Sequence, residues 1–327
     1  MDAKITKQRL GRLLSYDWLK IIGVAAAVII IWSLIFTVSA TRITPAQQFT
    51  VFNHYANRTL DRGTFHAHYD GAFEQGVFSY EVIELDTIDL VTAGENRYTM
   101  CDTRFSTGQG DMIYIPNITD TEMEEEGLQM TYLESFLCRY KPYIISWDEY
   151  LASARTYLND YYNGDYVNAP LNEAKAERDF RARVTENKDK RFRKESKIKE
   201  GVKDEFARLN KYRDAFVKFE KYLEEGVVKL ETVAYKDYET GEVFLDEQNQ
   251  PIQKNYALNI CPDENKANKL KEQVCYSVVG EDGTVKESAQ NMCVMLFFLP
   301  EMDDDFQYET ILYLNTVIAD SLTPTQA

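Results

Sequence analysis

A run of 21 residues without one charged side chain, from Ile21 to Thr41, constrains this chain more than any other feature. Its length matches the about 20 apolar residues that a helix needs to cross a bilayer. Residues 1–20 carry five basic and two acidic residues, and this asymmetry predicts a cytoplasmic N-terminus and an exported remainder. The small residues Val38, Ser39 and Ala40 resemble a cleavage site, so a cleaved signal peptide is the alternative interpretation. The run is longer, however, than the roughly 7–15 apolar residues of such a peptide. We therefore expect an uncleaved transmembrane helix at 21–41.

The remainder of the chain is long enough for one large domain or for two lobes. The net charge of the whole chain is −16, so its surface repels nucleic acid and no nucleic-acid partner is expected. All five cysteines follow the apolar run, on the side where disulfides persist. Because five is odd, at most two disulfides form, and the spacing does not reveal which: Cys101, Cys138, Cys261, Cys275 and Cys293.

Strand and helix signals alternate after the apolar run. Residues 48–55 and 78–85 have the β-branched and aromatic content of strands. Apolar residues at helical spacing predict a helix between Gly94 and Gly108, and a short buried strand follows at 111–116. A strand, a helix and a strand in this order predict an α/β domain with parallel strands. We assign residues 42–171 to a first α/β lobe with an aromatic helical segment.

Residues 172–230 differ from the rest of the chain. The stretch 172–222 holds 17 Lys or Arg and 11 Asp or Glu, and apolar residues recur in it every seven positions. This pattern predicts a charged helical hairpin with a solvated outer face. The last part, 231–327, is predicted to be a second α/β segment, with strands at 254–261, 274–280 and 291–300, an exposed hairpin at 240–252 and a helix at 306–322.

The segment TRFSTGQGDMIYIP (103–116) first suggests a phosphate-binding loop. Such a loop needs its glycines before a helix N-terminus, whereas these glycines follow a helix and precede a strand. We therefore interpret Gly108 as a left-handed helix cap, Gly110 as the turn into the strand, and Asp111 as a structural residue of that turn.

The segment HAHYD (66–70) copies the start of the His-x-His-x-Asp-His motif of metallo-β-lactamase-type hydrolases. Gly71 stands where the third histidine belongs, and His54 is the only other histidine of the chain. The sequence also lacks a G-x-S-x-G nucleophile motif. We expect neither a metal nor another cofactor, and no enzymatic activity. A cation-dependent hydrolase centred on His66 and His68 stays open as a minor alternative.

The order of these segments resembles that of extracellular solute-binding proteins of ABC importers, which have a type 2 periplasmic-binding-like fold. It is especially similar to membrane-anchored, divergent relatives from Gram-positive bacteria. The positions that match a helix, a glycine turn and a hydrophobic strand of the first lobe are Gly108, Gly110, Asp111, Met112 and Ile113. The resemblance implies a two-lobed domain that binds a small solute and contacts an importer permease. The chain departs from the family because it has no lipobox cysteine and because it carries the charged hairpin.

The resemblance fixes no ligand residues, so candidates come from the architecture. Ligands of open α/β sheets bind beyond the carboxyl ends of the strands. This rule nominates polar residues that follow the predicted strands, and two aromatic residues as a wall of the site: Asn53, Tyr55, Asp86, Asn117, Thr119, Tyr143 and Trp147. The alternative is an anchored extracellular scaffold that binds a membrane, wall or protein partner through the charged hairpin, without a small-molecule ligand.

Overall fold

The computed structural model describes residues 7–39, 47–54, 76–80, 82–186, 189–267, 269–272, 274–279, 284–299 and 308–322. The chain divides into two compact units, Met1–Ile43 and Thr44–Ala327. The expected division of the second unit into two lobes is not confirmed, because Thr44–Ala327 is a single compact unit.

The first unit contains one long helix, α1 (Lys7–Ser39). Within it Trp18–Phe36 has a mean hydropathy of 2.5, and none of this stretch is buried. The helix is therefore long and apolar enough to cross a membrane. A signal sequence near an N-terminus has the same properties, so this helix is compatible with either role.

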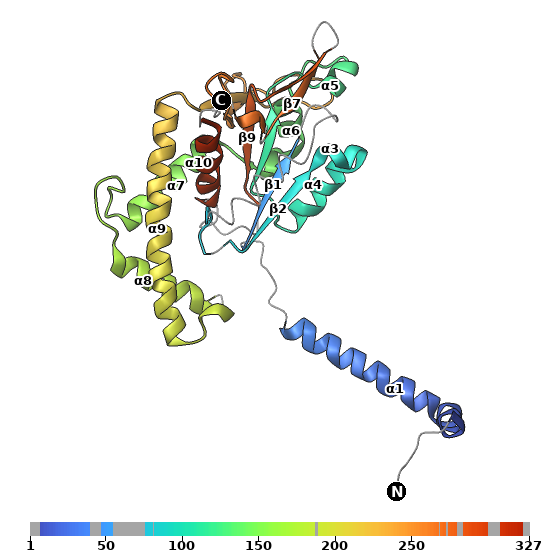
Figure 1. The fold of residues 1–327 in the computed structure, drawn as a ribbon. Helices are drawn as coiled ribbons and strands as arrows, with labels where there is room; N and C mark the ends of the chain where they lie inside the picture. Colours follow the sequence, from blue (N-terminus) through green and yellow to red (C-terminus); the bar gives the residue numbers. More distant parts are fainter. Residues whose placement is uncertain are drawn as a thin grey trace, which may run out of the picture. The chain divides into compact units, whose positions relative to one another are not determined.

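The second unit is built on a seven-stranded mixed sheet (Figure 1). Six strands follow one another across it in the order β2 (Glu84–Asp89), β1 (Gln48–Asn53), β3 (Met112–Pro116), β9 (Met292–Phe297), β6 (Gln253–Asn259) and β5 (Lys229–Ala234). The short strand β4 (Ile144–Ile145) pairs with β9. Strands β2, β1 and β3 are parallel, and the remaining pairings are antiparallel. The predicted α/β class with parallel strands is thereby confirmed, although β2 and β3 each pair with β1 and not with one another.

Helices cover both faces of this sheet, which is why its central strands are almost wholly apolar. Alternate residues of β3 enter opposite cores, with Met112 and Tyr114 in one and Ile113 and Ile115 in the other. The first core lies under α7 (Trp147–Tyr161), α9 (Glu195–Glu224) and α10 (Glu309–Leu322). The second lies under α4 (Arg97–Ser106) and α6 (Tyr132–Tyr140).

The strand predicted at 78–85 is misplaced. Strand β2 begins only at Glu84, and Phe78 and Ser79 precede it outside any strand. Phe78 packs its ring against Tyr313 of α10, and the Ser79 N–H donates to the Glu309 carboxylate at 3.0 Å. The apolar content of this segment therefore reflects burial in the core and not strand pairing.

The charged hairpin is confirmed as α8 (Glu173–Glu186) and α9, joined through a short 3₁₀ turn at Lys190–Phe192. The helices pack closely where α9 carries Gly201, because a Cβ at that position would overlap the rings of Phe180 and Phe192. The C-terminal part of α9 packs against α10 on the body of the domain.

Two further pieces belong to the second unit. A separate two-stranded sheet pairs β7 (Tyr276–Val279) with β8 (Val285–Ser288). Strand β7 corresponds to the strand predicted at 274–280. The predicted hairpin at 240–252 is present as two isolated bridges, Lys236 with Val243 and Leu245 with Pro251. The edge strand β5 and the strand β8 are not predicted by the sequence pattern.

Candidate functional site

β1 and β3 are the neighbouring strands between which the order of the sheet reverses, and the point of interest lies at their carboxyl ends. From β1 the chain passes to β2 on one side, and from β3 it passes toward β9 on the other. Connections that diverge in this way leave a crevice beyond the strand ends, where open α/β sheets bind their ligands. This is the candidate functional site.

Two polar residues lie at this point, Asn53 as the last residue of β1 and His54 directly after it. Asn53 is 1% exposed and His54 is 6% exposed, so both side chains are removed from water. Within the described residues, Asn53 Oδ1 and His54 Nδ1 have no hydrogen-bond partner. A buried polar atom without a partner costs about 1–3 kcal/mol, so these atoms are suited to groups supplied by a ligand.

His54 is held beside β3, because its backbone N–H donates to the Tyr114 carbonyl at 2.8 Å. Its ring lies 5.4 Å from the ring of Tyr132, centroid to centroid. Burial and, to a smaller extent, the nearby positive charge of Arg97 together lower the pKa of His54 to about 4. The imidazole is therefore neutral at pH 7 and is not a fixed positive charge.

Charged residues from the following helices border the site. Arg97, at the start of α4, forms an ion pair with Glu122 of α5 (Thr121–Glu125). Asp120 caps α5, and its second carboxylate oxygen accepts the Ser135 hydroxyl at 2.6 Å. The site thus combines a neutral imidazole and an amide with one neutralised ion pair, which suits binding of polar groups.

The structure places the nominated residues unequally. Asn117 and Thr119 follow β3 as predicted, Asn117 half-buried and Thr119 exposed and bridged to Thr131. Asp86 is not at a strand end, because β2 runs to Asp89, and its carboxylate pairs with Arg104 at 3.0 Å. Tyr55 lies outside the described residues, as do His66 and His68.

The structure does not bring the two residues of the predicted aromatic wall together. Trp147 has no exposed surface, stacks on Phe219 and donates its indole N–H to the Val294 carbonyl at 3.0 Å. Tyr143 packs on the opposite core, with its ring 5.4 Å from that of Phe105. The two side chains therefore lie on different faces of the sheet, with Trp147 inside one core and the half-buried Tyr143 against the other.

The glycine turn serves the fold as predicted. Gly108 has a φ of 70°, and Gly110, with a φ of 148°, lies where a Cβ would be 3.2 Å from Phe52 and from Phe105. Asp111 is buried and accepts the Thr50 N–H at 2.7 Å. Burial, assisted by the Glu309 charge and opposed by the Thr50 N–H, raises the pKa of Asp111 to about 7.

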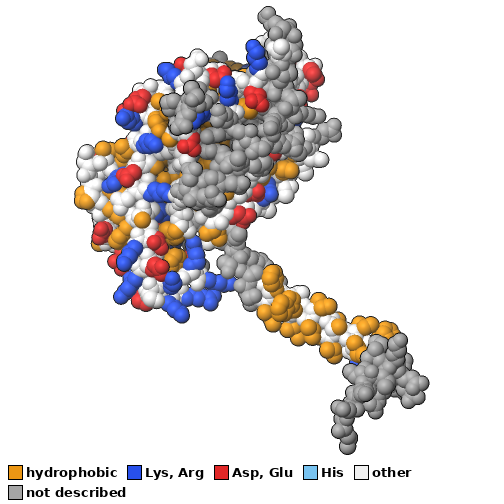
Figure 2. All heavy atoms as spheres, in the orientation of Figure 1, with side chains coloured by type: hydrophobic (Ala, Val, Ile, Leu, Met, Phe, Trp, Pro, Cys, Tyr) orange, Lys and Arg blue, Asp and Glu red, His pale blue; other side chains and the backbone are white. Residues whose placement is uncertain are grey.

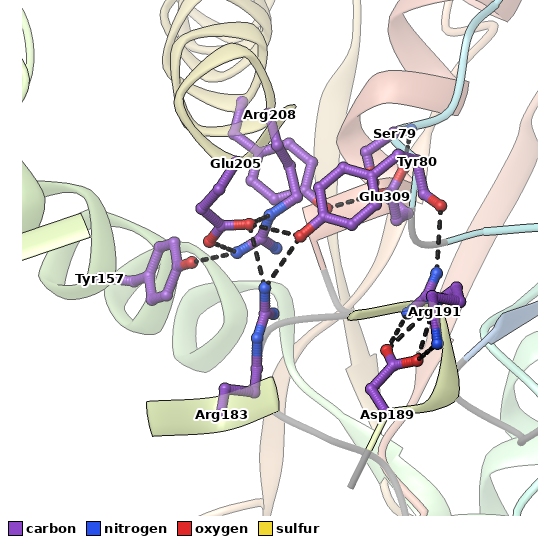
Figure 3. A network of polar contacts seen from close by, with 10 residues as sticks. Ser79, Tyr80, Tyr157, Arg183, Asp189, Arg191, Glu205, Arg208 and Glu309 are labelled. Atoms are coloured by element: carbon purple, nitrogen blue, oxygen red, sulfur yellow. Dashed lines mark hydrogen bonds and ion pairs between the residues drawn. The ribbon is translucent and has the colours of Figure 1, made fainter. Parts of the chain in front are cut away.

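A second polar cluster, which the sequence analysis did not identify, lies where the hairpin meets the body (Figure 3). The buried Glu205 carboxylate accepts from Arg208 at 2.5 Å, from Tyr80 at 2.8 Å and from Arg183 at 3.0 Å. Arg208 also donates to the Tyr157 hydroxyl at 3.1 Å. Glu205 and Arg208 are three residues apart on the apolar face of α9, and this interruption of the apolar pattern was the available signal.

The same cluster continues to α10. The fully buried Glu309 carboxylate accepts from the hydroxyls of Ser79 and Tyr212 and from the Ser79 N–H. Burial raises the pKa of Glu309, and these hydrogen bonds limit the increase. These hydrogen bonds connect α9, α10 and the segment before β2, and each of the groups named here has a partner inside the protein.

An open hollow of about 520 Å³ lies elsewhere, between α7, the end of α9 and β5. It has an apolar floor and three charged residues, and it is lined by Asp148, Leu151, Arg155, Leu223, Gly226, Val228, Lys229, Leu230 and Pro262. No residue of β1, β2 or β3 lines it. We place the candidate site at the strand ends, because the hollow has no buried polar atom without a partner among its described side chains.

Other chemistry finds little support in the described part of the chain. No group of three or more His, Cys, Asp or Glu residues there has the arrangement of a metal site. The five cysteines, all in described segments, form no disulfide with one another.

Comparison of the chain with protein-family models gives no match, and searches against curated proteins and solved structures give none either. The assignment of a site therefore depends on geometry alone.

Proposed function

We propose that this chain is a membrane-anchored extracytoplasmic binding protein without catalytic activity of its own. It is a divergent, two-lobed relative of solute-binding proteins and is accessory to an ABC importer, whose permease is its partner. Helix α1 is the anchor, with the N-terminus in the cytoplasm and Thr44–Ala327 on the outer side. The parallel strands β2, β1 and β3 support this proposal, because sheets of this kind bind their ligands beyond the carboxyl ends of such strands.

One observation carries the proposal: Asn53 Oδ1 and His54 Nδ1 are buried at the switch point without a partner among the described residues. A small polar solute with hydroxyl or amine groups supplies the missing hydrogen bonds. Specificity follows from the same atoms, since a site built to hydrogen-bond a ligand rejects an analogue that leaves buried polar groups unpaired.

The test is ligand-induced thermal stabilisation of the full chain in detergent, against a panel of amino acids, mono- and disaccharides and polyamines. At least one compound is expected to raise Tm saturably, because a ligand at 100 times its Kd stabilises by about 2.7 kcal/mol. The variants Asn53→Leu and His54→Phe remove the polar atoms at similar volume and are expected to abolish this shift.

Asn168→Ala, which changes an exposed loop amide, is the matched control and is expected to keep the full shift. A panel without any saturable effect counts against the proposal, and so does a shift that survives in both site variants. In that second case the ligand binds elsewhere, and the hollow beside Arg155 and Lys229 is the place to examine.

The alternative function is an anchored scaffold without a small-molecule ligand. The observation that favours it is the hairpin α8–α9, which carries exposed charged residues along most of its outer face. This function requires that partner binding persists in Asn53→Leu and is lost when the charges of the hairpin are changed.

A further inference from the structure

The tip of the hairpin, residues 189–200, is the most basic short segment that follows α1. It carries six Lys or Arg and three Asp or Glu in a chain whose net charge is −16. Figure 2 shows Lys and Arg side chains gathered at this end of the hairpin. Five of the six basic residues are exposed: Lys190, Arg193, Lys194, Lys197 and Lys199.

Most of the tip's cations are not neutralised by the protein. Lys197 pairs with Glu200 at 2.6 Å, and the half-buried Arg191 pairs with Asp189 at 2.8 Å. The other four form no ion pair within the described residues: Lys190, Arg193, Lys194 and Lys199. Cations that serve the fold are expected to have partners, as Arg183 and Arg208 do, so these four are available to an external anion.

The tip lies at the end of the domain where the chain arrives from α1. Arg191 donates to the Tyr80 carbonyl, and the ring of Phe192 lies 6.3 Å from that of Tyr80, just before β2. At the same end the Ile83 N–H donates to the Gln47 carbonyl, immediately before β1. Figure 1 agrees, since the hairpin tip and the start of β1 lie at one end of the sheet.

The length of the connection limits how far this end can lie from a membrane. Only eight residues separate Ser39, the last of α1, from Gln48, the first of β1. A fully extended chain of this length spans roughly 30 Å. An anchored domain of this kind therefore keeps its amino-terminal strand ends, and the cations beside them, close to the bilayer surface.

We propose that the hairpin tip binds anionic lipid headgroups of the membrane in which α1 is anchored, and so orients the domain on that membrane. The inference rests on the proposed anchoring by α1 and not on the proposed solute. Each Lys or Arg close to an anionic surface strengthens binding roughly fivefold. The attraction decays over about 8 Å at physiological salt, so the tip has to touch the headgroups.

The experiment is hydrogen–deuterium exchange of the full chain in nanodiscs of zwitterionic lipid and in nanodiscs with about one third anionic lipid. Peptides that cover 189–200 are expected to exchange at least threefold more slowly in the anionic discs, and 0.5 M salt is expected to remove the difference. The variant K190Q/R193Q/K194Q/K199Q is expected to lose it. The control K218Q/K221Q/K229Q/K266Q, which removes four exposed charges away from the tip, is expected to keep it.

Equal exchange of the tip in the two kinds of nanodisc overturns the inference. The inference also fails if soluble polyglutamate, added to zwitterionic discs, protects the tip as strongly as anionic lipid does. That result assigns the tip to an acidic polymer or protein. Flotation of the chain with vesicles separates this outcome from failure of the anchor. A chain that floats with zwitterionic vesicles is anchored whatever its tip does. One that floats only with anionic vesicles, and not in the tip variant, binds lipid through the tip without a membrane-spanning α1.

Discussion

Asp111 shows how one buried carboxyl makes the stability of the domain depend on pH. Its pKa is raised to about 7, first by burial and then by the Glu309 charge, while the Thr50 N–H opposes the increase. A carboxyl whose folded pKa exceeds its unfolded value stabilises the fold fully below the unfolded pKa, near 4. That contribution is lost as the pH rises through 7.

We therefore expect Asp111 to lower the free energy of unfolding by about 3–4 kcal/mol between pH 4 and pH 8. The measurement is urea unfolding across this range for the wild type and for Asp111→Asn, in which this dependence is expected to disappear. Asp148→Asn, at an exposed position, serves as the control and keeps the wild-type profile. An unchanged profile in Asp111→Asn means that the carboxyl does not titrate in this window.

The two glycines before Asp111 are expected to differ in how they tolerate a side chain. Gly108→Ala places alanine in a left-handed conformation at a cost of about 1–2 kcal/mol, and Gly108→Val costs more because its branched side chain resists positive φ. Gly110→Ala should cost more than Gly108→Ala, since its Cβ also meets Phe52 and Phe105. Urea unfolding at pH 6 ranks the three variants. Wild-type stability in all of them contradicts the structural role of this turn.

At the scale of elements, the sequence pattern predicted the central strands better than the edge strands. Strands β1, β3 and β9 are buried on both faces, so their apolar runs are visible in the sequence. The edge strands β2 (ELDTID) and β5 (KLETVA) are polar because much of each faces water. Only tertiary pairing identifies such strands, which is why β2 was placed too early and β5 was missed.

The candidate site was predictable to a similar extent. The strand-end rule located Asn53, Asn117 and Thr119, because β1 and β3 were recognised and their ends followed directly. It misplaced Asp86, whose strand was misassigned. The sequence could not predict the cluster around Glu205, because its members come from four distant segments that only the folded chain brings together.

The buried pair of Glu205 and Arg208 fixes how the hairpin docks. Removing Arg208 leaves the Glu205 carboxylate buried with fewer partners, so Arg208→Met is expected to destabilise the domain by about 3–5 kcal/mol. The double variant Glu205→Leu/Arg208→Met removes both charges and is expected to recover most of this loss.

A double-mutant cycle by urea unfolding measures this coupling. The exposed pair of Lys197 and Glu200 gives the comparison, with an expected cost below about 1 kcal/mol for Lys197→Met. If Arg208→Met is as mild as Lys197→Met, the buried pair does not hold the hairpin on the body.

For the whole molecule, none of the five cysteines forms a disulfide, and buried apolar clusters lie on both faces of the sheet and inside the hairpin. Burial raises the pKa of both Cys101 and Cys261 to about 12 and raises that of Cys293, so these thiols are poorly reactive. We expect slow maleimide labelling of these three in the native chain and labelling of all five cysteines in denaturant, with a Tm insensitive to dithiothreitol. Fewer than five reactive thiols in denaturant, restored by reduction, would indicate a disulfide.

The last prediction concerns the attachment of the molecule to its membrane. If α1 is an uncleaved anchor, the protein resists extraction from membranes by alkaline carbonate, dissolves in detergent and keeps its original N-terminus. One arginine in the middle of Trp18–Phe36 disfavours insertion by about 2.5–3.5 kcal/mol, so Ile29→Arg is expected to move much of the protein to the soluble fraction. Ile29→Leu is the control and is expected to stay in the membrane. Fractionation, combined with N-terminal sequencing of the wild type, decides the question, because a mature protein that begins at Thr41 was released by cleavage after Ala40.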